Sequence, residues 1–484
     1  EVSGWDGLLE GLRLRSVEPD PEARRGAIVG QIQSLAPTAL VSEDLVDENV
    51  HLTEWPQVTV GSFKEDFLEL PEPVLMTAMA KHEKMFPVAS PQGGLTNQFV
   101  FVRNGGEEEK VKAGNAWVLN ARFNDARFFF REDRKSTLEV FLERTSGMVF
   151  VEKAGTVRQR ADRLGKLMEY LAPGVEGAYQ AGLYAKADLS TGLVAELSSL
   201  QGVIGGDYAA REGFRPDVCA AIASQYSLTR ALLLDGSARR LAVSLVCADQ
   251  IDRLAVCLGA GLLPTGSSDP YALRRAAGVL IEAGFNEEAA IDWLPALHEA
   301  HRLCVEQGLE LSSFEETATA FKALLAQRYE SQLEGLRYDA VQAALEAGVT
   351  QPKLVKFRAE VMEQLRTNPD LVQTLLRPAN ILAAAEKKGL PIGEIPESGT
   401  DLSEGLGDAC ASALRAMSAA FTSLDQAQVL EALQTLADPI NAYFEGTMVM
   451  ADDEAVRASR LALVKRSALS AELLGDVRKL VIED

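Results

Sequence analysis

Side chains that could carry metal or acid–base chemistry are few in this sequence. His298 and His301 are three residues apart, which places both imidazoles on one face of a helix, as shared metal ligands require. No HExxH pattern accompanies them, so the spacing favours a solvated helix face over a metal site. None of the four histidines lies between residues 83 and 297, so that stretch cannot supply an imidazole.

Two further pairs of charged residues have a spacing that could serve catalysis. Asp249 and Asp252 share a helix face in "CADQIDRL", and Lys186 and Asp188 are close together in "KADLSTG". Charges on helices are more often surface charges engaged in ion pairs, and the sequence favours that interpretation for both pairs. No GxxxxGK[ST] or GxSxG motif is present, so neither a nucleotide-phosphate loop nor an activated serine is predicted.

Basic side chains gather in two stretches of a chain whose formal net charge is −22. Clustered cations attract phosphate even when the whole protein is acidic, and the alternative is a solvated face. The first stretch contains Arg131, Arg134, Lys135, Lys153, Arg158, Arg160, Arg163 and Lys166, and the second contains Arg457, Arg460, Lys465 and Arg466.

An adjacent pair of arginines follows a helix-start signal in "GSSDPYALRRAAGVL", residues 266–280. Asp269 can cap free amides, and Pro270 suits the first position of a helix. An apolar face follows at three- and four-residue spacing: Leu273, Ala276, Ala277 and Leu280. This pattern predicts that Arg275 points away from that face and that Arg274, at its edge, has a partner or reaches solvent.

The elements that would position these groups are mostly helical. Strand patterns occur in "QVTVGSF" and "QFVFVRN", with a short helix "PEPVLMTAMAKHEKMF" and a hairpin-type loop "SPQGG" between them. After Lys112 the periodicity is helical almost throughout. The segment 387–405 carries Gly, Pro and acidic residues and is predicted to be a flexible loop.

Length and composition set broad limits on the kind of protein. With 484 residues, 47% hydrophobic and 24% charged, the chain is long enough for several globular domains. Its five cysteines form no CxxC pair, which argues against a disulfide framework and a structural zinc site. No apolar run is long enough to cross a membrane. Because the chain starts at Glu1 rather than Met, we expect processing or truncation.

Several long blocks, in order, resemble the β subunit of bacterial-type (or plastid) glycyl-tRNA synthetase. They include "WPQVTVGSFKEDFLELPEPVLMTAMAKHEKMFPV", "GNAWVLNARFNDARFFFRED", "KADLSTGLVAELSSLQGVIGGDYA" and "GLLPTGSSDPYALRRAAGVL". The blocks "GLRYDAVQAALEAG", "RPANIL" and "MVMADDEAVRASRLALVKR" follow in the same order. The resemblance extends from about residue 20 to the C-terminus.

The resemblance implies a mostly α, multidomain fold. It divides the chain into a partial N-terminal mixed α/β region (1–145), an HD-like helical domain (146–285), a helical linker (286–372) and a DALR-type anticodon-binding domain (373–484). The HD-like part contains no histidine, so a phosphohydrolase metal site cannot be assembled there, and a metal hydrolase is rejected.

The resemblance also implies a function: a non-catalytic tRNA-recognition subunit, or β-like half, of glycine–tRNA ligase. ATP and Mg²⁺ are then expected on the catalytic α subunit or domain, and tRNA-Gly as the nucleic-acid partner, in a hetero-oligomer without membrane contact. The location would be the bacterial cytoplasm or the plastid stroma. The alternative is a scaffold that keeps the family fold but has lost tRNA recognition, within a larger organellar assembly.

Residue roles follow from the matched blocks. Asp269 and Arg274 are expected to be structural, with Arg274 tied to neighbouring acidic groups, and no residue is expected to be catalytic. Two positions depart from the family pattern, Gln250 where lysine is usual and Ser459 where asparagine is usual. The candidates for contact with RNA are Arg377 and Asn380 of "RPANIL", with Arg275, Arg457, Arg460, Lys465 and Arg466.

Overall fold

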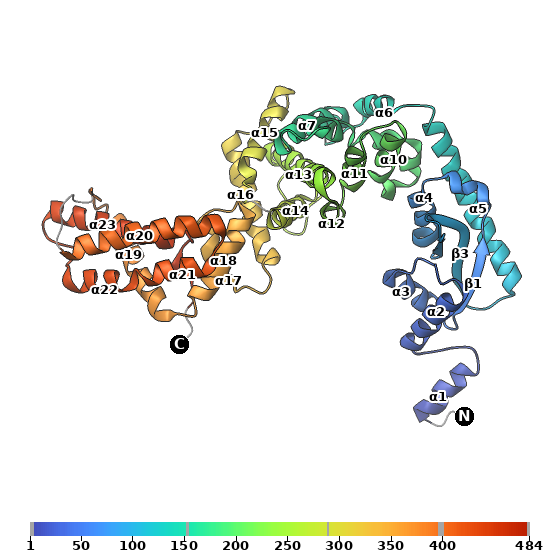
Figure 1. Ribbon diagram of the computed structural model, residues 1–484, viewed down its shortest axis with the longest axis horizontal. Helices are drawn as coiled ribbons and strands as arrows, with labels where there is room; N and C mark the ends of the chain where they lie inside the picture. The colour runs from blue at the N-terminus through green and yellow to red at the C-terminus, as the bar shows by residue number, and fades with distance from the viewer. Residues whose placement is uncertain (1–3, 152–153, 288–289, 395–400, 482–484) are drawn as a thin grey trace. The chain divides into compact units, whose positions relative to one another are not determined.

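The computed structural model describes residues 4–151, 154–287, 290–394 and 401–481 (Figure 1). The chain forms two compact units, residues 1–150 with 156–245 and residues 151–155 with 246–484. Helices dominate both units, which confirms the predicted mostly helical, multidomain fold. The four finer residue boundaries stay predictions. In the described part of the chain, no helix is long and apolar enough to span a bilayer.

The first unit begins with helices around a small antiparallel sheet of strand order β1-β3-β2. Asp20 caps α2, whose first residue is Pro21, and Ser42 caps α3, so both helices start at polar residues that satisfy free amides. The elements are α1 Gly4–Arg13, α2 Pro21–Leu35, α3 Glu43–Leu52, β1 Gln57–Ser62, η1 Glu65–Glu69, α4 Glu72–Met76, the π-helical turn η2 Thr77–His82, β2 Phe86–Ala89 and β3 Leu95–Arg103.

The sheet contains one strand that the sequence pattern missed. The predicted strands are present as β1 and β3, which pair with Gln57 opposite Arg103. The "SPQGG" loop, however, joins β3 to β2 rather than to β1. Strand β2 is only four residues long and begins four residues after the helical turn η2 ends, so it is too short for an alternating pattern to mark it. Residues of α2, α3 and the sheet form one core, including Ile28, Ile32, Val46, Val58 and Val100.

Helix α5, Glu108–Asp133, leads from the sheet into the helical remainder of the first unit. Asp133 at its end accepts hydrogen bonds from the amides of Gly192 (2.8 Å) and Leu193 (2.9 Å). The elements that follow are α6 Leu138–Arg144, η3 Thr145–Gly147, α7 Val157–Leu171, α8 Ala178–Tyr184, η4 Ala187–Ser190, α9 Gly192–Glu196, η5 Ser198–Leu200, α10 Val203–Arg211, α11 Pro216–Ser224 and α12 Leu228–Leu232. Helix α13, Gly236–Gly259, starts in the first unit and continues into the second after Leu245.

The second unit is helical in all its described elements and ends in a bundle of five helices, α19–α23. Ser313 and Glu316 form a capping box at α16, and Asn368 with Pro369 starts α19, so sequence signals fix these helix starts. The elements are α14 Leu273–Asn286, α15 Trp293–Glu306, α16 Phe314–Gln332, α17 Tyr338–Leu345, α18 Pro352–Leu365, α19 Pro369–Lys387, α20 Asp401–Ser423, α21 Gln426–Gln434, α22 Ala437–Gly446, α23 Glu454–Glu472 and η6 Val477–Lys479.

Candidate nucleic-acid interface

The five-helix bundle carries most of the predicted RNA contacts. Helix α19 packs against α22 and α23, and α20 packs against α21, α22 and α23. Apolar residues from each helix fill the core, among them Leu375, Met417, Leu433, Ile440 and Leu461. Because the core fixes the rotation of each helix, it decides which polar residues of α19 and α23 reach the surface.

Arg377 and Asn380 lie together on the exposed side of α19. The guanidinium of Arg377 donates a hydrogen bond to the Asn441 side-chain oxygen of α22 at 2.8 Å. Pro378 between them is buried inside the helix, where it removes one backbone hydrogen bond. The structure therefore brings two of the candidates together and adds Asn441, which the sequence interpretation missed because its partner is 64 residues away.

Arg457 and Arg460, near the start of α23, bind the loop that joins α22 to α23. Arg457 donates to the carbonyl oxygen of Ala451 at 2.9 Å, and Arg460 donates to that of Met448 at 2.7 Å. Val449 of the same loop is buried in the bundle core, whereas Met448 is exposed. Both arginines thus hold the loop in place, a role that their position in a basic run did not reveal.

Lys465 and Arg466 have different surroundings from these two arginines. Lys465 is exposed, and among the described residues it has no hydrogen-bond or ion-pair partner. Arg466 is half-buried; burial raises the pKa of the Cys410 thiol to about 11, and the positive charge of Arg466 opposes that rise. At about 100° per residue, Arg460 and Lys465 are separated by roughly 140° around the helix axis. The four cations of α23 therefore form no single stripe.

Arg275 lies on α14, outside the bundle, and its side chain is exposed. Helix α14 begins at Leu273, so Pro270 is not its first residue as predicted. Asp269 nevertheless accepts hydrogen bonds from the amides of Leu273 (2.8 Å) and Arg274 (3.0 Å). The guanidinium of Arg274 donates to the carbonyl oxygen of Gly266 at 2.8 Å, so the expected acidic partner is replaced by a backbone carbonyl.

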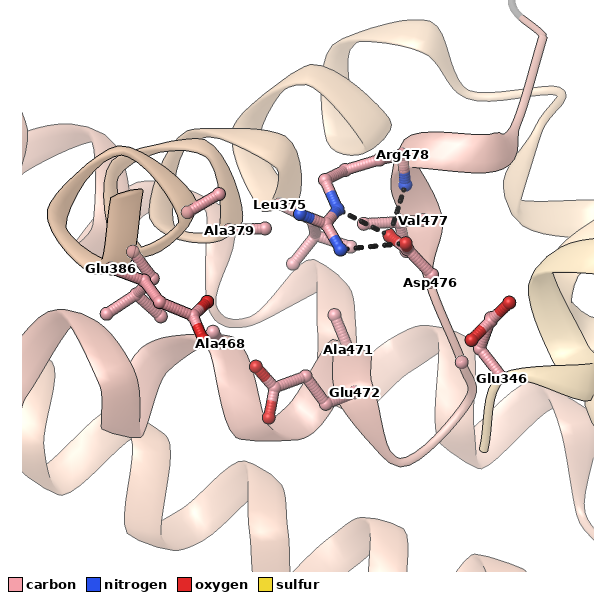
Figure 2. A pocket seen from close by; sticks show the side chains of 13 residues that line it. Glu346, Leu375, Ala379, Glu386, Ala468, Ala471, Glu472, Asp476, Val477 and Arg478 are labelled. Carbon is pink, nitrogen blue, oxygen red and sulfur yellow. Dashed lines mark hydrogen bonds and ion pairs between the residues drawn. The ribbon is translucent and has the colours of Figure 1, made fainter. Parts of the chain in front are cut away.

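A cavity of about 300 Å³ opens between α19 and α23 (Figure 2). Its walls are mainly alanine and leucine with carboxylates, and Glu386 of α19 and Glu472 of α23 point toward one another across it. Arg478 is paired with Asp476 at 2.7 Å, so it is already neutralised. Phosphate is repelled by such walls, and RNA contact is therefore expected elsewhere on the bundle.

The two pairs of charged residues that were predicted to lie on the surface are buried instead. Asp249 and Asp252 are fully buried, as are Lys186 and Asp188. The ammonium of Lys186 donates to Gln225 at 2.8 Å and to the hydroxyl of Tyr226 at 3.1 Å. The expected surface location was wrong because the helical spacing of charges does not tell which face of a helix is covered.

Of the two histidines of α15, His298 is exposed as predicted, whereas His301 is not. His301 is buried, with its Nε2 atom 2.9 Å from the carbonyl oxygen of Ser312, and both imidazoles contact the ring of Phe314 edge-on. Within the described ranges, no group of three or more His, Cys, Asp or Glu side chains is arranged to hold a metal ion.

Burial changes the acidity of Asp188. One carboxylate oxygen accepts hydrogen bonds from the backbone amides of Gly202 (2.5 Å) and Gly205 (3.0 Å) at the start of α10. The other carboxylate oxygen has no hydrogen-bond partner. Burial raises the pKa of Asp188 to about 6, although both amides and the charge of Lys186 oppose the rise. The folded chain therefore binds this proton more tightly than the unfolded chain does.

This acidity predicts a pH dependence of stability. Between the unfolded pKa of 3.8 and the folded value of about 6, the contribution of Asp188 to the free energy of unfolding falls as the pH rises. The loss is expected to approach about 3 kcal/mol. Urea unfolding of the wild type and of Asp188→Asn at pH 4.5, 6 and 7.5 measures this loss. The contributions of the other titrating groups cancel when the free energy of unfolding of the variant is subtracted from that of the wild type. A difference that does not change with pH contradicts the prediction.

Similarity to known proteins defines the class of protein to which the chain belongs. Residues 371–475, which cover the bundle, match the family described as "DALR anticodon binding domain". A domain of this kind on a multidomain helical chain defines a component of an aminoacyl-tRNA synthetase.

Residues 1–346 match the family described as "Glycyl-tRNA synthetase beta subunit". The chain is 35% identical to the glycine–tRNA ligase β subunit of Desulfitobacterium hafniense (strain Y51), an alignment that covers 95% of this chain and 68% of that protein. It is 33% identical to the β subunit of Geobacter metallireducens, over 99% of this chain and 71% of that protein. It is 31% identical to the β subunit of Bacillus subtilis, over 98% of this chain and 70% of that protein. The chain belongs to the glycyl-tRNA synthetase β subunit family.

Proposed function

We propose that this chain is the non-catalytic tRNA-recognition subunit, or β-like half, of glycine–tRNA ligase. The observation that carries the proposal is the anticodon-binding match over the bundle whose surface carries Arg377, Asn380 and Lys465. Phosphates are bound by Arg and Lys, and unstacked anticodon bases are bound by aromatic or amide side chains. The bundle offers both kinds of group.

The bond-making step is assigned to a partner. The family name and the lack of a phosphate-binding loop in the sequence support a catalytic α subunit or domain that binds ATP and Mg²⁺. The assembly is then a hetero-oligomer that contains tRNA-Gly. We place it in the bacterial cytoplasm or the plastid stroma; the relatives compared above are bacterial.

A filter-binding titration of tRNA-Gly against salt tests the proposal. Recognition predicts preference for tRNA-Gly over other tRNAs and an affinity that falls steeply with salt, because bound cations release counterions from the phosphates. Equal, weak binding of all tRNAs contradicts it.

Lys465 gives the sharpest residue-level test, because it is exposed and its removal leaves the bundle core intact. Lys465→Ala is expected to weaken tRNA-Gly binding about 3- to 10-fold and to reduce the salt slope by about 1, the loss of one phosphate contact. Lys322→Ala, an exposed lysine of α16, is the matched control and should leave both values unchanged. Equal effects of the two substitutions indicate a general charge effect and contradict a contact at Lys465.

A second candidate function is a scaffold that keeps the fold without recognising tRNA. The observation in its favour is that Arg457 and Arg460 are engaged by backbone carbonyls within an acidic chain. A mass measurement of the assembly from its native source, combined with the titration, separates the two. The scaffold function is supported if the mass shows a catalytic partner in the assembly while the titration shows no preference for tRNA-Gly.

A further inference from the structure

Two arginines of the second unit have no carboxylate partner. Arg275 of α14 is exposed, and Arg328 of α16 is half-buried. Neither guanidinium has a hydrogen-bond or ion-pair partner within the part of the chain that the structure describes. Other arginines of the same unit, such as Arg302 and Arg366, each pair with a carboxylate. In a chain of net charge −22, two uncompensated cations indicate a site for an anion.

Gly278 of α14 brings these side chains to one place. Helices α14 and α16 pack against each other, and two α16 side chains lie over this glycine. From the position that a Cβ atom would have at Gly278, the amide nitrogen of Gln332 is 3.5 Å away and Nε of Arg328 is 3.9 Å away. Arg275 precedes Gly278 by three residues, and such neighbours have Cβ positions about 5–6 Å apart on one side of a helix. The guanidinium of Arg275 is therefore within side-chain reach of the other two groups.

The side chains that meet at Gly278 offer hydrogen-bond donors to a ligand. The Nε atom of Arg328 is buried and has no hydrogen-bond partner. The side-chain amide of Gln332 has no partner among the described residues either. A buried N–H group without an acceptor is destabilising, so an oxyanion that accepts a hydrogen bond from it would stabilise the site. The planar guanidinium of Arg328 can donate from Nε and from a terminal nitrogen to two oxygens of one phosphate.

One carboxylate lies beside the three donors. Glu282 follows Gly278 by one turn of α14, is exposed, and forms no ion pair with either arginine in the described part of the chain. Two cations outnumber this single anion, so the local charge remains positive and attracts phosphate. Two neighbouring cations also suit a nucleic-acid strand, because its phosphates follow one another along the backbone.

We infer that Arg275, Arg328 and Gln332 form a phosphate-binding site on α14 and α16, outside the anticodon-binding bundle, and that it binds a backbone phosphate of the tRNA. Arg328 supplies two parallel donors, Gln332 a neutral donor and Arg275 a second positive charge. The assignment to tRNA rests on the proposed function, whereas the phosphate chemistry does not; free inorganic phosphate is the other source of the same group. A contact of this kind positions the strand without reading its bases.

The first arm of the test is a tRNA-Gly titration against salt with the full chain. Arg328→Gln and Arg275→Gln are each expected to raise the Kd about 3- to 10-fold and to reduce the salt slope by about 1. Glu282→Gln removes a repulsive charge and should lower the Kd about 2- to 3-fold. Arg230→Gln, at an exposed arginine of α12, is the matched control and should leave both values unchanged.

The second arm uses inorganic phosphate in place of RNA and measures the thermal midpoint of the full chain. A ligand that binds only the folded chain raises this midpoint. Tens of millimolar phosphate should raise the wild-type midpoint by about 2 °C over chloride at equal ionic strength. The double variant Arg275→Gln with Arg328→Gln should lose this shift. Arg328→Lys keeps the charge but loses the parallel donors, so its shift should lie between the two. Unchanged midpoints in chloride show that the variants are folded.

The combined outcomes decide between the site and its source of phosphate. Weaker tRNA-Gly binding in the arginine variants, together with loss of the phosphate shift, supports the inference. Loss of the phosphate shift with unchanged tRNA binding makes free phosphate the source and overturns the assignment to tRNA. No change in either arm overturns the site itself, because Arg328 then contacts water only. If the wild type binds all tRNAs equally, the proposed function fails, whereas the phosphate arm still decides whether the site exists.

Discussion

Replacing Gly475 with alanine should lower the free energy of unfolding of the second unit by about 3–5 kcal/mol. Gly475 has a φ of +136°, a conformation that is nearly restricted to glycine. An added Cβ atom would overlap the carbonyl oxygen of Ala343 in α17. The amide of the next residue, Asp476, donates to that same oxygen at 3.0 Å. The substitution therefore separates the end of the bundle from α17.

Gly348 provides the matched control for this substitution. It has a φ of +126°, but an added Cβ atom would have no atom within 4 Å. Gly348→Ala therefore isolates the backbone strain, with an expected cost of about 1–3 kcal/mol. Calorimetry of the full chain, with hydrogen exchange at η6, measures both variants. Equal costs would show that contact with Ala343 contributes nothing, which contradicts the prediction.

Replacing Arg457 and Arg460 together with alanine should destabilise the bundle by about 2–4 kcal/mol and also weaken tRNA binding. Each guanidinium holds a carbonyl oxygen of the loop 447–453, so the loop loses its support when both are removed. Burial raises the pKa of Tyr443, and the positive charge of Arg460 opposes that rise, so Arg460 also lies near this core tyrosine. The sequence alone placed both arginines only among the candidates for contact with RNA.

One further double variant separates loop support from direct contact with RNA. Arg457→Lys with Arg460→Lys keeps the charges but loses the geometry of the guanidinium group. If the arginines support the loop, this pair should destabilise the bundle nearly as much as the alanine pair does, as measured by thermal unfolding. If stability is kept while the alanine pair loses only tRNA affinity and salt dependence, the arginines act through their charge, and loop support is refuted.

The fold class was predictable because it depends on local patterns. The alternation in "QVTVGSF", the helical periodicity after Lys112 and the polar residues that cap helices act over a few residues, and each occurs in the structure as an element. Strand β2 was missed because its four residues carry no alternation; pairing with β3 defines it. The ordered motif blocks identified the family, which the comparisons confirm.

The roles of individual charged residues were decided by tertiary structure. The spacing of Asp188, Asp249 and His301 in the sequence is typical of solvated side chains on a helix. Neighbouring elements nevertheless bury all three. Arg457 lies in a basic run, yet its nearest partner is a loop carbonyl that the sequence pattern does not place beside it. The sequence determined which helices form and the family they belong to. Packing between distant segments decided which charges face solvent, because a side chain's dielectric surroundings and hydrogen-bond partners come from other parts of the chain.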